Sequence, residues 1–244
     1  MPIYRRKFAK KTGRSRKGLP FKPTRSIVPY GSFHSKPGYG VPANPVPARL
    51  RTQMQYAVYS ALGGGSLAGL AQAHVYRGNS IYDPQFALGG RTVVGHANMA
   101  NLYGNYIVTG VKVEVTFTSP SEDNTWVGVR MRINNNHQAA GNSMQDIAEK
   151  PLTVFKAMNT QSGQSAKIEC KFKPWELMAV SKQSYMDDIN YSSVISSNPP
   201  IDNCKFDVFS INPSLNGASV GYILRVWYDV TLFNRIGQTS SLLA

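Results

Sequence analysis

The residues best placed to do chemistry are the cations near the start of the chain. Ten of the first 25 residues are Lys or Arg, and none is Asp or Glu. Lys and Arg neutralise phosphates whatever the base sequence, and a block of like charge stays extended until a polyanion stabilises it. We therefore predict a nucleic-acid-binding segment that uses Arg5, Arg6, Lys7, Lys10, Lys11, Arg14, Arg16, Lys17, Lys22 and Arg25.

Aromatic residues are scattered among these cations, and they favour single-stranded over duplex nucleic acid. Rings can stack on unpaired bases, which every single strand offers. The aromatic residues are Tyr4, Phe8, Phe21, Tyr30 and Phe33. The competing interpretation is a nuclear-import signal, which uses the same basic residues, and one segment can serve both purposes.

The charge distribution divides the chain into three zones. Residues 1–82 contain 14 Lys/Arg and no carboxylate, whereas residues 83–244 contain 13 of each sign. We predict a basic arm at 1–36, a stiff Pro/Gly-rich linker at 37–50 that includes "PGYGVPANPVPA", and a body of zero formal charge at 51–244. A body of this length is sufficient for one well-cored domain.

The body alternates apolar and polar residues with the period of two that β-strands have. In "YIVTGVKVEVTFTS", for example, Val111, Val113 and Val115 share one face, and Lys112 and Glu114 the other. Eight strands are predicted, near 54–61, 72–78, 106–119, 126–133, 152–158, 166–172, 205–212 and 220–233. Short helices are predicted at 143–150 and 174–181. Because Ile223, Trp227 and Phe233 add apolar residues to its second face, we expect the last strand to be covered on both sides.

The connections between these strands alternate strictly between short and long. In an antiparallel sandwich, successive connections fall at opposite ends, so the short, small-residue loops should gather at one end. This pattern predicts an all-β fold, an eight-stranded two-sheet jelly roll, which a basic extended N-terminal arm precedes. A plain meander barrel would give the same alternation and stays open.

The sequence contains no recognisable motif for catalysis or cofactor binding. "GASVG" around Ser219 precedes a strand and has no later histidine, unlike a nucleophile elbow. The four histidines are dispersed, two cysteines cannot make a zinc site, and "GGGSLAG" lacks the Lys of a phosphate loop. We expect no enzyme activity, cofactor or metal. The chain also has no apolar run of membrane-spanning length and no secretory signal, and we read its cysteines as free thiols.

Taken together, the basic arm, the proline-rich linker and the eight-stranded body resemble the capsid (coat) proteins of small circular Rep-encoding single-stranded DNA viruses, the circovirus-like group. The stretch "YRGNSIYDPQFALGG" adds to this resemblance, because such proteins often carry an Asn-Ser and then an Asp-Pro step after a β-segment. Here those positions are Asn79, Ser80, Asp83 and Pro84, but Gln85 stands where a second acid is common. The resemblance covers nearly the whole chain.

The resemblance implies a shell subunit whose strands, lettered B to I, form sheets BIDG and CHEF. Such a subunit assembles with itself, in about 60 copies for the simplest (T=1) icosahedron, and packages single-stranded nucleic acid, ssDNA in this group, with its arm. It implies a location in the virion and in the host nucleus during assembly. Its further partners would be nuclear import receptors and a host-cell receptor, without membrane insertion. In this setting Arg130 and Arg132 either face the shell interior or are interface or solvent charges.

Two other classes of function compete with the shell subunit. A non-viral nucleic-acid-binding β-domain with a basic tail would carry cations on its body as well, whereas this body has no net formal charge. An enzyme built on a jelly roll would cluster His and carboxylates inside the barrel, and no such spacing occurs.

Overall fold

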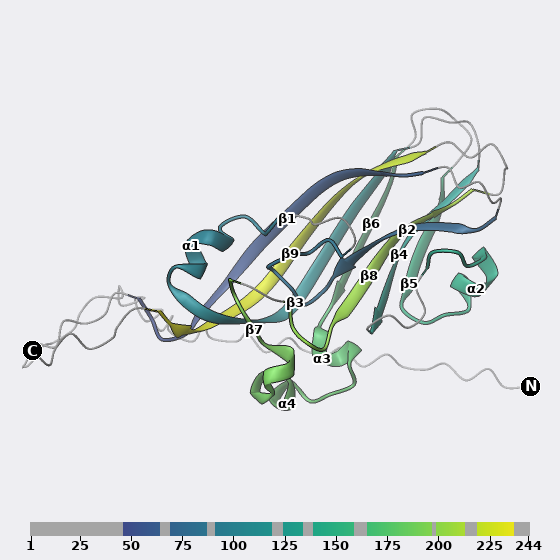
Figure 1. Ribbon diagram of the computed structural model, residues 1–244. Helices are drawn as coiled ribbons and strands as arrows, with labels where there is room; N and C mark the ends of the chain where they lie inside the picture. The colour runs from purple at the N-terminus through teal and green to yellow at the C-terminus, as the bar shows by residue number, and fades with distance from the viewer. Residues whose placement is uncertain are drawn as a thin grey trace, which may run out of the picture. The chain divides into compact units, whose positions relative to one another are not determined.

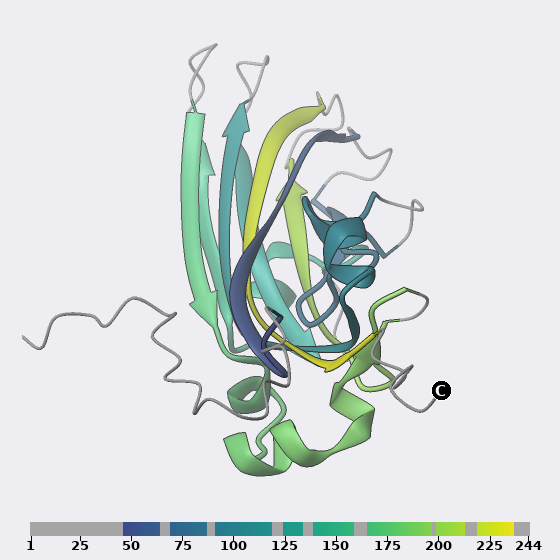
Figure 2. The ribbon, with the colours of Figure 1, turned by 90° about the vertical axis from the view of Figure 1, so that its left-hand side faces the viewer.

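Two antiparallel β-sheets face each other in the computed structural model (Figures 1 and 2). The structure describes residues 46–63, 69–86, 91–118, 124–133, 139–158, 165–196, 199–212 and 219–236. They belong to a compact unit that spans Pro45–Ala244. The boundary predicted between residues 36 and 37 lies among undescribed residues, and the one between 50 and 51 lies inside the described range 46–63; the division into three zones stays a prediction.

The first sheet has the order β1-β9-β3-β6, and the short β7 pairs with β3. Its strands are β1 (Leu50–Leu62), β9 (Val220–Arg235), β3 (Tyr103–Thr118), β6 (Ser165–Phe172) and β7 (Ser193–Val194). The second sheet has the order β2-β8-β4-β5. Its strands are β2 (Ala71–Arg77), β8 (Cys204–Ile211), β4 (Thr125–Ile133) and β5 (Thr153–Met158).

This strand order confirms the predicted all-β jelly roll. Setting β7 aside, the eight main strands in chain order take the letters B to I, and the two sheets become BIDG and CHEF. All ladders are antiparallel. A meander barrel pairs consecutive strands and closes by pairing the last strand with the first, whereas here β9 also pairs with β3 and β2 pairs with β8, so the alternative is wrong.

The register also confirms that the short connections flank one end of the sheets. Leu62, at the end of β1, lies opposite Val220 at the start of β9. Thr118, at the end of β3, lies opposite Ser165 at the start of β6. The loops themselves lie largely outside the described residues. Helices α3 (Pro174–Leu177) and α4 (Lys182–Asp187) lie beyond the other end of the sheets (Figures 1 and 2).

The core lies between the two inner faces, as the alternation predicts. Val111, Val113 and Val115 of β3 are at most 3% exposed, and Val127 and Val129 of β4 are fully buried. Side chains of a two-residue period can fill this space because every second residue of each strand points inward. A bulge between Val108 and Gly110 resets the alternation of β3.

A second, smaller core lies on the outer face of the β2-β8-β4-β5 sheet. There α2 (Met144–Ala148) brings Ile147 against Phe209, and Trp126 stacks edge-on against Phe155 at 5.8 Å between ring centroids. Ser143 and Asp146 form a capping box that starts α2. As a consequence, β8 is buried on both faces over its full length.

The prediction that β9 is covered on both sides is wrong. Ile223 is 44% exposed, and Trp227 and Phe233 are only half-buried. No second layer of the described structure covers Trp227. The Lys112 ammonium lies over its ring, 4.9 Å from the ring centre. A long cationic side chain can shield an apolar ring while its charge stays in water.

The predicted helices were found in shortened form, and other elements were missed. Residues 174–181 form only α3 before a turn in which Ala179 has φ 56°. The missed elements are α1 (His96–Ala100), α4, the 3-10 helix η1 (Ile189–Tyr191) and β7. Each has six residues or fewer, which is too short for a periodic pattern to emerge.

Candidate nucleic-acid and assembly surfaces

The ten predicted phosphate-binding residues, Arg5 to Arg25, lie outside the described residues. Their role therefore stays a prediction. What the structure does describe is the body to which that arm belongs, together with most of the body's own charged residues.

The Asn-Ser and Asp-Pro stretch has a structural role in the chain reversal after β2. Asn79 is buried; its side chain donates to the Asp202 carbonyl at 2.7 Å and accepts from the Cys204 N–H at 3.2 Å. Asp83 forms an ion pair with Arg77 at 2.9 Å. The Asn79 amide is bonded to residues just before and at the start of β8, and the Asp83 carboxylate is paired with Arg77 of β2. This stretch therefore ties β2 to the start of β8.

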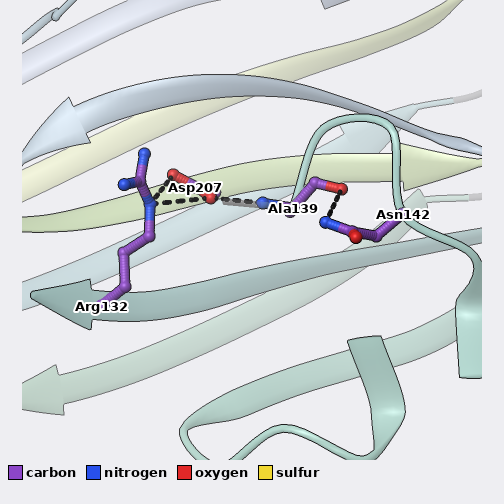
Figure 3. Close-up of polar contacts among 4 residues, drawn as sticks. All are labelled: Arg132, Ala139, Asn142 and Asp207. Carbon is purple, nitrogen blue, oxygen red and sulfur yellow. Dashed lines mark hydrogen bonds and ion pairs between the residues drawn. The ribbon is translucent and has the colours of Figure 1, made fainter. Parts of the chain in front are cut away.

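A buried ion pair joins β4 to β8 (Figure 3). Arg132 Nε lies 2.9 Å from Asp207 Oδ1, and the two side chains are 4% and 0% exposed. The Ala139 N–H donates to Asp207 Oδ2 at 2.7 Å, and Asn142 holds the Ala139 carbonyl in turn. The predicted placement of Arg130 and Arg132 at the shell interior, an interface or solvent is therefore wrong: both are buried within one subunit, at 2% and 6% exposure.

Two further cations lie next to this pair and make the cluster net positive. Arg130 faces Asp207 across the ladder, and Lys205 faces Arg132. Burial, together with repulsion from Arg132 and Arg77, lowers the pKa of Lys205 to about 8. Burial also lowers the pKa of Arg130, whose Nε and Nη1 meet no partner in the described part of the chain. Burial raises the pKa of Asp207, against the pull of Arg132.

Sequence reasoning missed this cluster because its members meet only through strand pairing. The segment "KFDVFSI" shows Lys205 and Asp207 two positions apart, a spacing that puts them on one face of a strand. Arg130 and Arg132 show the same spacing. This spacing predicts which residues share a face of each strand. It does not predict that the two strands are neighbours, because 75 positions separate Arg132 from Asp207.

The outer face of the β1-β9-β3-β6 sheet carries paired charges. Lys112 pairs with Glu169 at 3.1 Å, and Lys167 pairs with Glu114 at 2.9 Å. Arg225 approaches the same Glu114 at 3.6 Å. Exposed pairs of this kind contribute little stability, but they leave these five side chains nearly balanced, with one excess positive charge. The observation agrees with the formal neutrality of the body.

Polar side chains also penetrate the main core, where they form a chain of hydrogen bonds. The His74 Nδ1 and Tyr222 hydroxyl are 2.6 Å apart, and the Tyr222 and Tyr76 hydroxyls are also 2.6 Å apart. Burial lowers the pKa of His74 and raises that of Tyr222. The chain links β2 of one sheet to β9 of the other.

Across the residues that the structure places, no three His, Cys, Asp or Glu side chains come close enough to share a metal ion. Cys170 and Cys204 are free thiols, as predicted, and both are buried. None of the helices in the described segments is both long and apolar enough to cross a bilayer.

Comparisons with known proteins find likeness only among solved structures. No protein-family model and no curated protein matches the chain. The chain is similar to Cocksfoot mottle virus, with 8% identity, a TM-score of 0.47, and coverage of 77% of this chain and 96% of that one. It is similar to the decameric BFDV capsid protein at 9% identity and TM-score 0.42, covering 75% and 98%. For Turnip Yellow Mosaic Virus the values are 12%, 0.42, 80% and 99%.

All three TM-scores lie below 0.5, so the fold assignment rests on strand order and register. By those criteria the class is plain: the described body is an all-β, two-sheet jelly roll.

Proposed function

We propose that this chain is the coat-protein subunit of a small icosahedral virus, which assembles with itself and packages single-stranded nucleic acid through its basic arm. The observation that carries the proposal is the union of two features in one chain. A jelly roll with the strand order β1-β9-β3-β6 and β2-β8-β4-β5 follows a segment with ten cations in 25 residues and no carboxylate.

The division of charge gives this union a mechanism. Binding of phosphates by the arm is independent of base sequence and sensitive to salt, as packaging of a whole genome requires. The body has 13 charges of each sign after residue 82, so copies can meet without strong mutual repulsion. Arm charge is unfavourable in an empty shell and favourable in a filled one, which couples packaging to assembly.

The finer features follow the resemblance to the circovirus-like group. They are an ssDNA genome, a T=1 shell of about 60 copies, and entry into the host nucleus through the same basic residues. A shell of that size would bring roughly 840 positive charges to its genome, given a net charge of +14 per chain.

Sedimentation of the purified chain, with absorbance at 260 and 280 nm, tests the proposal at low and high salt. We expect a megadalton particle whose 260 nm absorbance is lost when residues 1–36 are deleted. A chain that stays a monomer of 26.8 kDa, yet binds oligonucleotides, would replace the proposal with a tailed nucleic-acid-binding domain. Nucleic acid packaged equally well without the arm would overturn the arm's role alone.

A further inference from the structure

An apolar pocket opens where β4 ends and β5 begins, next to α3. It has a volume of about 390 Å³ and is lined mainly by Met131, Ile133, Leu152 and Leu177. Of these, Ile133 is 37% exposed and Leu152 is 51% exposed. Val154, two residues further along the chain, is 38% exposed. Large side chains left in water at the mouth of a cavity mark a surface that another molecule can cover.

The backbone at the pocket supports this view. Leu152 has φ 64°, in the left-handed region that a bulky residue adopts only under constraint. The ladder imposes the constraint, because the Met131 N–H donates to the Leu152 carbonyl at 3.0 Å. The strained turn presents an apolar side chain outward, and a polar residue would serve solubility better there.

The charge around the pocket is net positive, although Asp207 pairs with one of its arginines, Arg132. Its lining includes Lys150 and the two arginines Arg130 and Arg132, and it includes no carboxylate. A partner for this surface must therefore present apolar side chains flanked by negative charge.

The chain carries such a surface elsewhere, in the connection between β6 and β8. Ile189 and Ile201 are 79% and 76% exposed, more than any other isoleucine in the described ranges. Their segments are adjacent, because the Asp202 N–H donates to the Asn190 carbonyl at 3.2 Å. Carboxylates immediately precede or follow the two isoleucines, at Asp188 and Asp202.

The two carboxylates also act on the tyrosine beside them. The pKa of Tyr191 is raised by partial burial and by the nearby carboxylates of Asp202 and Asp188. Asp188 also accepts from the Asn190 N–H at 2.9 Å, which starts η1 and holds the segment in place. We call Asp188, Ile189, Ile201 and Asp202 the acidic knob.

We propose that the acidic knob of one copy of this chain docks into the Lys150–Leu152 pocket of a neighbouring copy. Knob and pocket share no residue, so the contact is head-to-tail, and repetition of such a contact closes a ring or shell when the rotation permits. Apolar side chains supply the buried area, and the opposite charges set orientation and exclude wrong pairings. The inference rests on the proposed self-assembly and names the contact that drives it.

Charge reversal tests the docking. Lys150→Glu and Asp202→Lys should each raise the protein concentration needed for assembly by at least about tenfold, since like charges placed face to face repel. The double variant should recover most of the loss, because the pair is restored with its signs exchanged. Lys171→Glu, the same reversal on the exposed face of β6, serves as the matched control and should assemble normally. Sedimentation velocity measures all four against the unaltered chain.

Leu152→Gly separates assembly from folding. Glycine removes the side chain from the pocket mouth and also relaxes the positive φ, so thermal stability of the dissociated subunit should be unchanged or higher. Assembly should nevertheless weaken at least tenfold. If the three single variants Leu152→Gly, Lys150→Glu and Asp202→Lys all assembled normally, the docking would be overturned, and the proposed shell function would stay intact. An unaltered chain that never assembles would overturn both.

Disulfide trapping identifies the contact directly. Cys170 and Cys204 are 9% and 0% exposed, so introduced thiols would react first. We expect Leu152→Cys and Ile201→Cys chains, mixed and oxidised during assembly, to give a covalent dimer that neither chain forms by itself. A dimer formed as readily by either variant alone would contradict the head-to-tail arrangement.

Discussion

Arg132 and Asp207, 75 positions apart in the sequence, form an ion pair of 2.9 Å whose side chains are 4% and 0% exposed. The pair links β4 to β8, and the Ala139 N–H adds a third member from the connection that leads to α2. It thus ties the outer layer of the second sheet to the sheet itself. A buried pair of this kind is costly to break, even where its formation contributes little net stability.

Removing one partner of this pair should therefore be far more harmful than removing the neighbouring cation. We expect Asp207→Asn to lower the free energy of unfolding by about 3–5 kcal/mol, because Arg132 loses its counter-charge in a buried site. Arg130→Met should leave that free energy unchanged or raise it by about 1–4 kcal/mol, since Arg130 is buried with unsatisfied nitrogens. Urea denaturation of the dissociated subunits measures both. Equal losses in the two variants would contradict the assigned pairing.

Gly128 occupies a position in β4 where a side chain has no room. A Cβ there would collide with the Phe209 ring and lie 2.8 Å from the Val154 carbonyl oxygen, which is backbone and cannot rotate away. We expect Gly128→Ala to lower the midpoint of thermal unfolding and to cost about 1–3 kcal/mol through overpacking. Gly63→Ala is the control, because nothing lies within 4 Å of a Cβ there. A Gly128→Ala chain as stable as the control would show that the smaller core on the outer face of β4 and β8 yields more easily than its packing indicates.

Acid should weaken the subunit through His74. Burial lowers the pKa of His74, so the unfolded chain binds a proton at a higher pH than the folded chain does. Stability is therefore intact above the ordinary histidine pKa of about 6.5 and falls as the pH drops from there through the lower folded pKa. His96 is shifted in the same direction by burial and adds to the effect. Stability measured against pH should flatten near pH 6 in His74→Gln, and an unchanged slope would exclude this origin.

Salt should weaken nucleic-acid binding in proportion to the arm's charge. With ten phosphate contacts to a single strand, the slope of log K against log salt is expected to be about −7. Replacing Arg5, Arg6, Lys7, Lys10 and Lys11 with Gln should halve that slope, because each lost contact releases one counterion fewer.

The matched control for the arm changes cations on the body. Lys167→Gln with Lys171→Gln removes two exposed charges from β6 and should leave the slope unaltered. Fluorescence anisotropy with a labelled oligonucleotide gives both slopes. A slope that follows the body substitutions instead would place the phosphate contacts on the jelly roll.

Most of the fold was predictable because strand period and connection length are local properties of a chain. The alternation from Val111 to Phe117 indicates a half-buried strand without reference to any other segment, and all eight predicted strands are present. Short helices such as α1 and α4 were missed, since five or six residues contain fewer than two turns of pattern. The bounds of β1 were also misjudged: it begins at Leu50, and the polar Thr52 on its inward face interrupts the apolar half of the alternation.

The sequence by itself determined the charge division, the eight main strands and the alternation of short and long connections, because these need only neighbouring residues. Only the tertiary structure decided which individual side chains are buried and which residues they contact. It buried Arg130 and Arg132, which look solvent-facing in "WVGVRMRI", because Asp207 arrives from a distant strand and α2 covers that face. It also left Ile223 in water and joined the segments that carry Ile189 and Ile201. Such juxtapositions depend on which strands pair and on what covers each sheet, and no local pattern contains that information.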